Sequence, residues 1–239
     1  MKHLSLISLL AALTLMCGCA PELPPVALFE NDLSNAQQAE AWSVDKDGVL
    51  SATADKTLFT KNQYENFILS LEFKAGEKSN AGVVLYCTQL EDWPAYSLEV
   101  QLCDNKTAGE NAWARCGAIF GHVAPAKEID PALNEWHKLT ILAKGKLVKV
   151  WIDDKLTTRM DMAEWTSLDV APDGTTKIPA HLAKQKKADM PTKGFIGLQG
   201  LHGKGEGVVY RNIVLHPLPT GKTAKSLEEE SKEQNPEEL

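Results

Sequence analysis

The chain has 239 residues, of which 44% are hydrophobic and 24% are charged, and its formal net charge is −7. Its basic residues form no cluster, which argues against nucleic acid as a partner because phosphates demand clustered Lys and Arg. Roughly 220 residues follow the N-terminal segment, which is enough for one β-rich domain with a sizeable core.

The N-terminal segment is typical of export. Lys2 precedes an apolar run at 4–15, and Gly18 is the small residue expected before a cleavage point. The apolar run has about 12 residues, whereas a bilayer span takes roughly 20. We expect residues 1–18 to be a signal peptide, and we expect no transmembrane segment in the rest of the chain.

The end of this segment, Met16-Cys17-Gly18-Cys19, resembles a bacterial lipobox. In that motif the Cys after the small residue is lipidated and becomes the new N-terminus. The resemblance implies that Cys19 is lipidated, that residues 19–26 form the lipidated Cys and a tether, and that the membrane is a partner. It places the protein in the bacterial cell envelope, on the periplasmic or the cell-surface side. The alternative is an ordinary secretory signal with incidental cysteines.

Between residues 28 and 215, strand-like segments recur between turn signals. They predict an all-β fold of antiparallel sheets, a sandwich or a barrel, in one domain over 27–218. The segment 178–188, opened by Pro179, could hold a single short helix. Residues 219–239 are charged and almost free of apolar side chains, so we expect a disordered tail. The predicted strands include 69–73, 83–86, 98–103, 118–122, 138–143, 147–153, 194–199 and 208–215.

Three cysteines remain besides the lipidated one: Cys87, Cys103 and Cys116. No Cys-x-x-Cys pair suggests zinc, and an exported compartment permits at most one disulfide among three thiols. Cys103 and Cys116 bracket a polar loop and are the best candidates for a bridge.

The strand predicted at 98–103 has one apolar face and one polar face. Its leucines and valine fall on one face, and Glu99 and Gln101 fall on the other, because successive side chains alternate across a strand. If the strands at 69–73 and 83–86 are its neighbours, then Glu72 and Tyr86 share that polar face. Such a face could bind a sugar; the alternative is that these are plain solvated residues.

Seven motifs in order resemble the 3-keto-disaccharide hydrolase domain family: SNAGVVLY (79–86), LEVQLCDN (98–105), GAIFGH (117–122), NEWHKLTI (134–141), VWIDD (150–154), GFIGLQG (194–200) and VVYRNIVL (208–215). The resemblance implies a concanavalin-like jelly-roll sandwich of two antiparallel sheets. It also implies action on glycosides oxidised at C3 of the sugar ring. Exported sugar oxidoreductases that make or reduce this ketone are the implied partners.

Two positions depart from the family pattern. Family members commonly carry Arg where this chain has Tyr86, and Tyr where it has Phe120. A Tyr lacks the charged fork that Arg offers to sugar oxygens. Phe120 keeps a ring that can stack on a sugar face. These departures bear on the choice of substrate.

A 3-keto sugar can be cleaved by elimination, because the ketone acidifies the hydrogen on C2 and the group on C1 can then leave. Water can add to the resulting enone and complete a net hydrolysis. The reaction needs a base, an acid and positive charge near the developing enolate. Glu99 is the best candidate base, and its alternative role is a hydrogen bond to a sugar hydroxyl. Asp104 is a candidate acid or metal ligand, or else it caps the following turn.

His122 and His202 follow strand-like motifs at positions where loops build sites. Either could donate a proton or bind a divalent metal ion that polarises the ketone; the sequence does not identify a cofactor. A loop histidine can equally be a plain surface residue. Besides the catalytic candidates Glu99, Asp104 and His122, the candidate substrate-binding residues are Glu72, Tyr86, Gln101, Phe120, Gln199 and His202.

The sequence therefore predicts an enzyme that cleaves 3-keto-glycosides. Because a fold does not determine a function, two other classes stay open. One is a non-catalytic carbohydrate-binding lipoprotein module, and the other is an accessory lipoprotein that docks to surface proteins. An enzyme needs a titratable group in a concave site, whereas a module needs only amides, aromatic rings and a groove.

Overall fold

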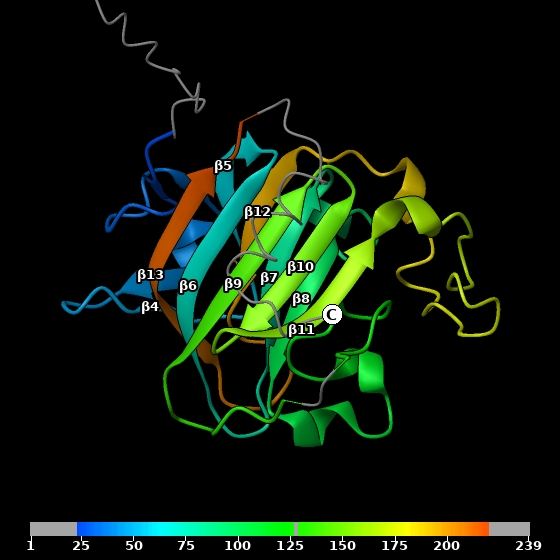
Figure 1. Cartoon of the computed structure of the whole chain (residues 1–239). Coiled ribbons are helices and arrows are strands. Elements are labelled where there is room, and N and C mark those ends of the chain that lie inside the picture. Colours follow the sequence, from blue (N-terminus) through cyan, green and yellow to red (C-terminus); the bar gives the residue numbers. More distant parts are fainter. Residues whose placement is uncertain (1–22, 127–128, 220–239) are drawn as a thin grey trace, which may run out of the picture.

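A computed structural model describes residues 23–126 and 129–219. Two antiparallel sheets pack face to face, and Figure 1 shows the larger one in front of the smaller one. The described residues contain no α-helix. The strands are β1 (Val26–Ala27), β2 (Ala36–Gln37), β3 (Trp42–Val44), β4 (Leu50–Ala52), β5 (Leu58–Tyr64), β6 (Phe67–Ala75), β7 (Asn80–Cys87), β8 (Leu98–Cys103), β9 (His137–Lys144), β10 (Leu147–Ile152), β11 (Lys155–Asp161), β12 (Gly194–Gln199) and β13 (Val208–Pro217).

Each sheet collects strands that are distant in sequence. The larger sheet has eight of the described strands, in the order β11-β10-β9-β6-β13-β4-β3, with β1 paired to β13. The smaller sheet has five, in the order β2-β5-β12-β7-β8. This is the predicted all-β jelly-roll sandwich. Short 3-10 helices lie in the connections: η1 (Ala39–Ala41), η2 (Leu90–Asp92), η3 (Asn105–Ala108), η4 (Ala112–Ala114), η5 (Met162–Glu164) and η6 (Lys187–Asp189).

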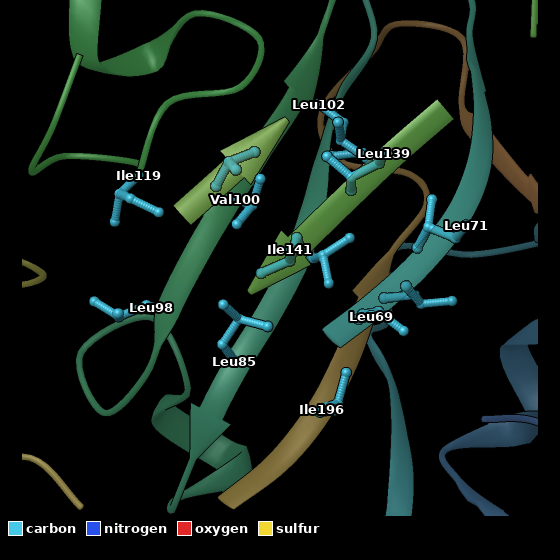
Figure 2. Close-up of a cluster of buried hydrophobic side chains, with 14 of the residues drawn as sticks. Leu69, Leu71, Leu85, Leu98, Val100, Leu102, Ile119, Leu139, Ile141 and Ile196 are labelled. Atoms are coloured by element: carbon cyan, nitrogen blue, oxygen red, sulfur yellow. The ribbon is translucent and has the colours of Figure 1, made fainter. Parts of the chain in front are cut away.

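The core lies between the two sheets, where alternate residues of each strand meet. Leu69 and Leu71 of β6 face inward, as the burial pattern of β6 requires, and Ser70 and Glu72 face outward. Figure 2 shows Leu69 and Leu71 of β6 in the same buried cluster as Leu85 of β7, with Ile141 of β9 between them. Burying a leucine side chain contributes about 1.5–3 kcal/mol, so the alternation predicted from the sequence stabilises the sandwich.

The structure corrects the predicted polar face. Strand β6 belongs to the larger sheet, whereas β7 and β8 are neighbours in the smaller one. The outward face of β6 therefore lies on the opposite side of the sandwich from the outward face of β8. Glu72 shares no face with Glu99, and its carboxylate instead pairs with Arg211 of β13.

Tyr86 is also displaced from its expected position. Its backbone is left-handed, with φ 56°, and the pairing of β7 with β12 shifts register between Phe195 and Gly197. These irregularities break the alternation of β7. The Tyr86 ring turns into the core against Phe67, with ring centroids 6.2 Å apart. Its burial there is incompatible with binding a sugar.

Two local predictions are wrong. Residues 118–122 form turns rather than a strand, with Gly117 and Gly121 at φ 83° and 69°. A positive φ interrupts extended backbone, and only Ile119 keeps isolated bridges to its neighbours. The segment 178–188 holds turns, and η6 begins only at Lys187.

The predicted disulfide is absent. Cys87, Cys103 and Cys116 are free and buried, and the Cys103 thiol instead donates to the carbonyl oxygen of Ala114 at 3.4 Å. Burial raises the pKa of Cys103 to about 11, and its thiol therefore stays protonated near neutral pH.

Several predictions lie outside the described residues: the signal peptide, the lipidated Cys19, the first part of the tether, and the tail apart from Pro219. In the part of the chain that is described, no helix is long and apolar enough to cross a membrane.

Candidate active site

A cleft of about 650 Å³ lies on the outer face of the smaller sheet. Five of the residues predicted from the sequence line it together: Glu99, Gln101, Phe120, Gln199 and His202. A volume of this size is typical of small-molecule sites, which run from about 300 to 1,000 Å³.

Strand register places two glutamines on either side of one glycine. Gly82 of β7 pairs with Gln199 of β12 on one side and with Gln101 of β8 on the other. Gly82 leaves room for the neighbouring carboxylate: a Cβ at this position would lie 2.4 Å from Glu99 Oε1. Gly82 therefore provides the space that the Glu99 carboxylate occupies.

Glu99 has unusual electrostatics for a carboxylate. None of the ion pairs among the described residues includes it, and burial raises its pKa to about 8. Desolvation disfavours the charged form, so the carboxyl group exchanges a proton close to neutral pH. A group poised in this range can act as a general base or a general acid.

The two amides beside Glu99 form a small network. Gln101 is only 2% exposed, and its Nε2 donates to Asn80 Oδ1 at 2.8 Å. Its Oε1 is buried and has no hydrogen-bond partner in the described part of the chain. Buried polar groups are normally paired, and an unpaired one at a cleft is typical of a site that binds another molecule.

One wall of the cleft is apolar. Phe59, Val84 and Cys87 form a small buried cluster on this face of the sheet, separate from the main core. Leu90 and Trp93, in and just after η2, pack against this cluster and line the cleft. Trp93 and Asn80 were missed by sequence reasoning. Two signals could have pointed to them. Asn80 lies within the SNAGVVLY motif, and Trp93 lies in the connection between the motifs at 79–86 and 98–105.

Aromatic and basic groups complete the lining. Phe120 packs edge-on against Trp113, with ring centroids 5.4 Å apart, and its ring is half-buried at the cleft. His202 Nδ1 lies 3.0 Å from Asp55 Oδ2, and both residues are exposed. His181 lines the same cleft. Two imidazoles are therefore available there as proton donors.

Asp104 has a structural role. Its Oδ1 accepts from the backbone N–H of Lys106 and caps η3, and its Oδ2 accepts from the N–H of Lys78. Both oxygens are used by the protein and the side chain does not line the cleft, as the turn-capping alternative predicts.

His122 does not line the cleft either. Its Nδ1 bonds the carbonyl oxygen of Phe120 at 2.7 Å, and its ring packs against Trp165. Burial, followed by the nearby charge of Lys187, lowers its pKa to about 4, so the ring is neutral near pH 7.

The described residues contain no group of three or more His, Cys, Asp or Glu side chains placed to hold a metal ion. The chemistry available at the cleft is that of a carboxyl group, amides, imidazoles and aromatic rings.

The fold and the cleft define a jelly-roll protein with a concave polar site on its smaller sheet. The model of the 3-keto-alpha-glucoside-1,2-lyase-like domain matches residues 25–216, and the chain belongs to this family. A comparison with curated proteins finds no significant match.

Solved structures agree with this assignment. A proposed glycosyl hydrolase from Parabacteroides distasonis is 40% identical, with a TM-score of 0.77 over 82% of this chain and 100% of that chain. A second proposed glycosyl hydrolase from the same organism is 19% identical, with a TM-score of 0.62 over 82% and 94% of the two chains. A Bacillus subtilis protein with a galectin-like fold is 14% identical, with a TM-score of 0.51 over 82% and 95%. The last two support the fold alone.

Proposed function

We propose that this protein cleaves 3-keto-glycosides by base-catalysed elimination in the cleft of the smaller sheet. The observation that carries the proposal is the placement of Glu99, a carboxyl group with a pKa of about 8 and no counter-charge, at the centre of a polar lining. The family to which the chain belongs supports the same chemistry.

In the proposed reaction Glu99 removes the proton from C2, which the C3 ketone acidifies. The electron pair of the C–H bond first forms an enolate and then the C1–C2 double bond, while the C1–oxygen bond breaks. The leaving oxygen takes a proton from His202, His181 or water. The sugar product is an enone, and the addition of water across its double bond would complete a hydrolysis.

The amides suit the charge that develops on the ketone oxygen. Because Asn80 Oδ1 accepts from Gln101, the Asn80 amide is oriented and its own N–H groups remain available to a ligand. Gln199 adds a second amide on the neighbouring side. Preorganised donors of this kind stabilise an enolate more than water does, because they need no reorganisation during the reaction. Trp93 and Phe120 would hold the sugar ring by its apolar face.

The direct test compares 4-nitrophenyl 3-keto-α-glucoside with its unoxidised parent. We expect the protein to release nitrophenol from the keto sugar and not from the parent, because only the ketone acidifies C2. Cleavage of the parent at a similar rate would indicate a conventional two-carboxylate glycosidase. Binding of both sugars without cleavage would indicate the carbohydrate-binding module.

We also propose that the protein is lipid-anchored through Cys19 in the bacterial cell envelope, where an exported oxidoreductase that oxidises the C3 hydroxyl would supply the substrate. The Gly18-Cys19 pair after the apolar run supports this proposal. Replacing Cys19 by Ser should move the protein from the membrane fraction to the soluble fraction. Unchanged fractionation would contradict the anchor.

A further inference from the structure

A second hollow, of about 460 Å³, shares no lining residue with the cleft. It is built from η4 and the segment 122–124, from β11 and η5, and from the loop at 171–176. Its residues come from segments far apart in the sequence that the fold brings together at the β11 edge of the larger sheet. The proposed reaction uses none of them.

The hollow has an aromatic side. Trp113 is half-buried and Trp165 is 5% exposed, and both line it together with the ring of His122. The His122 and Trp165 rings pack with centroids 5.1 Å apart. Indole rings offer a flat apolar surface with a polar N–H at one edge, which suits ligands with both apolar faces and hydroxyl groups.

The other side is polar and carries both signs of charge. Arg159 and Glu164 line the hollow, are exposed, and form no ion pair or side-chain hydrogen bond with the described residues. Asp161 and Asp173 also line it; one oxygen of Asp161 accepts from Ala163, and both oxygens of Asp173 accept from Thr175 and Thr176. Three carboxylates against one guanidinium disfavour an anionic ligand. Arg159 and Glu164 remain available as donor and acceptor.

His122 contributes an unmet acceptor. A carbonyl oxygen can only accept, so Nδ1 carries the hydrogen in its bond to Phe120 and Nε2 is left with a lone pair. Nε2 is buried and has no partner among the described residues. A hydroxyl group can supply the missing hydrogen, because a neutral imidazole nitrogen accepts from uncharged donors.

We propose that this hollow is a second carbohydrate-binding site, separate from the cleft, that holds a neutral oligosaccharide. One sugar ring stacks against the indole of Trp113, and hydroxyl groups bond Arg159 and Glu164. The volume falls within the usual range for ligand pockets. A flat aromatic surface together with a donor and an acceptor that have no protein partner matches a sugar better than a purely apolar or purely charged ligand.

The two sites lie on either side of one aromatic pair. Phe120 lines the cleft, Trp113 lines the hollow, and the two rings contact each other. An oligosaccharide held in the hollow would therefore lie next to the cleft. The binding site does not depend on whether the cleft cleaves its ligand.

The test is a titration of the full-length protein with trisaccharides of glucose, galactose and mannose, observed through the indole N–H signals in NMR spectra. At least one of these sugars should shift the Trp113 and Trp165 signals saturably. Arg159→Ala should weaken this binding about tenfold, since it removes hydrogen bonds from a charged donor. Lys155→Ala is the matched control, because Lys155 is an exposed cation on the same strand outside the hollow. It should leave the affinity unchanged.

Glu99→Gln separates the two sites. If the hollow binds sugar independently, this cleft variant keeps the shifts at Trp113 and Trp165. Three results would overturn the proposal: no saturable shift at these indoles with any of the three sugars, an equal loss in Lys155→Ala, or loss of the indole shifts in Glu99→Gln.

Discussion

The outer faces of the two sheets carry similar sequence patterns but very different chemistry. On the larger sheet, Glu72 pairs with Arg211, whose guanidinium lies 4.0 Å from the centre of the Trp136 ring. Lys138 likewise pairs with Asp154 at 2.8 Å. The polar groups there pair with one another in contact with water, and such surface pairs contribute little stability.

On the smaller sheet, one carboxyl group and one amide oxygen are left without protein partners among the described residues. Glu99 has no counter-charge and a raised pKa, and Gln101 keeps a buried oxygen without a hydrogen bond. Both line a cavity. Alternation therefore identifies an outward polar face, whereas a site needs concavity and unmet hydrogen-bonding capacity as well.

The largest expected effect compares one carboxylate from each face. Glu99→Gln keeps the shape of the side chain but removes the base, so turnover of the 3-keto substrate should fall by about 10²- to 10⁴-fold. Glu72→Gln is the matched control and should leave turnover unchanged. Equal turnover of wild type and Glu99→Gln would mean that another group is the base.

A smaller effect is expected at Gly82. A methyl group there would collide with Glu99 Oε1 at 2.4 Å and with the Val100 carbonyl oxygen at 2.8 Å. Gly82→Ala should displace the carboxylate and lower turnover of the folded protein by about 10- to 10²-fold, since misplacement by about 1 Å can have that effect. Circular dichroism would measure the folded fraction, and normal turnover per folded molecule would rule out this role for Gly82.

Phe120 tests the aromatic part of the cleft. Phe120→Leu keeps apolar volume but removes the flat ring, so we expect KM to rise about 2- to 10-fold while kcat changes less. The corresponding change on the larger sheet, Trp136→Leu, should leave both constants unchanged. If Phe120→Leu lowers kcat alone, the ring acts on the transition state rather than on sugar binding.

The smallest effect concerns the thiols, one of which lies on the same strand as Glu99. Because Cys103 and Cys116 are not bridged, a reductant should leave Tm unchanged. Alkylation after denaturation should label all three thiols of the domain, and native protein should react slowly because the thiols are buried. A bridge would instead contribute about 3 kcal/mol, which reduction would remove as a clear drop in Tm.

The strands were predictable because their core side chains follow a period of two, as Leu69 and Leu71 do. Sheet membership was not predictable from that pattern. The partners of β6 are β9 and β13, both far away in the sequence, and nothing local in β6 specifies them. The same limit explains the misplacement of Glu72.

Residues that line the cleft were predictable where strand and motif coincide, as at Glu99, Gln101 and Gln199. The misplaced residues depend on backbone detail: the left-handed φ of Tyr86 turns it into the core, and Asp104 is held by the N–H groups of Lys78 and Lys106. The cap on Lys106 was the alternative that the sequence offered for Asp104, whereas the φ of Tyr86 and the contact with Lys78 arise only when the chain is folded.

The most direct test of the account is the pH dependence of kcat/KM for the 3-keto substrate, corrected for its uncatalysed breakdown. A base works when deprotonated, so with a pKa of about 8 for Glu99, kcat/KM should rise with pH and level off above pH 8. The residual activity of Glu99→Gln should lack this rise. A wild-type kcat/KM that falls through pH 8, or that stays flat across it, would contradict the assignment of Glu99 as the base.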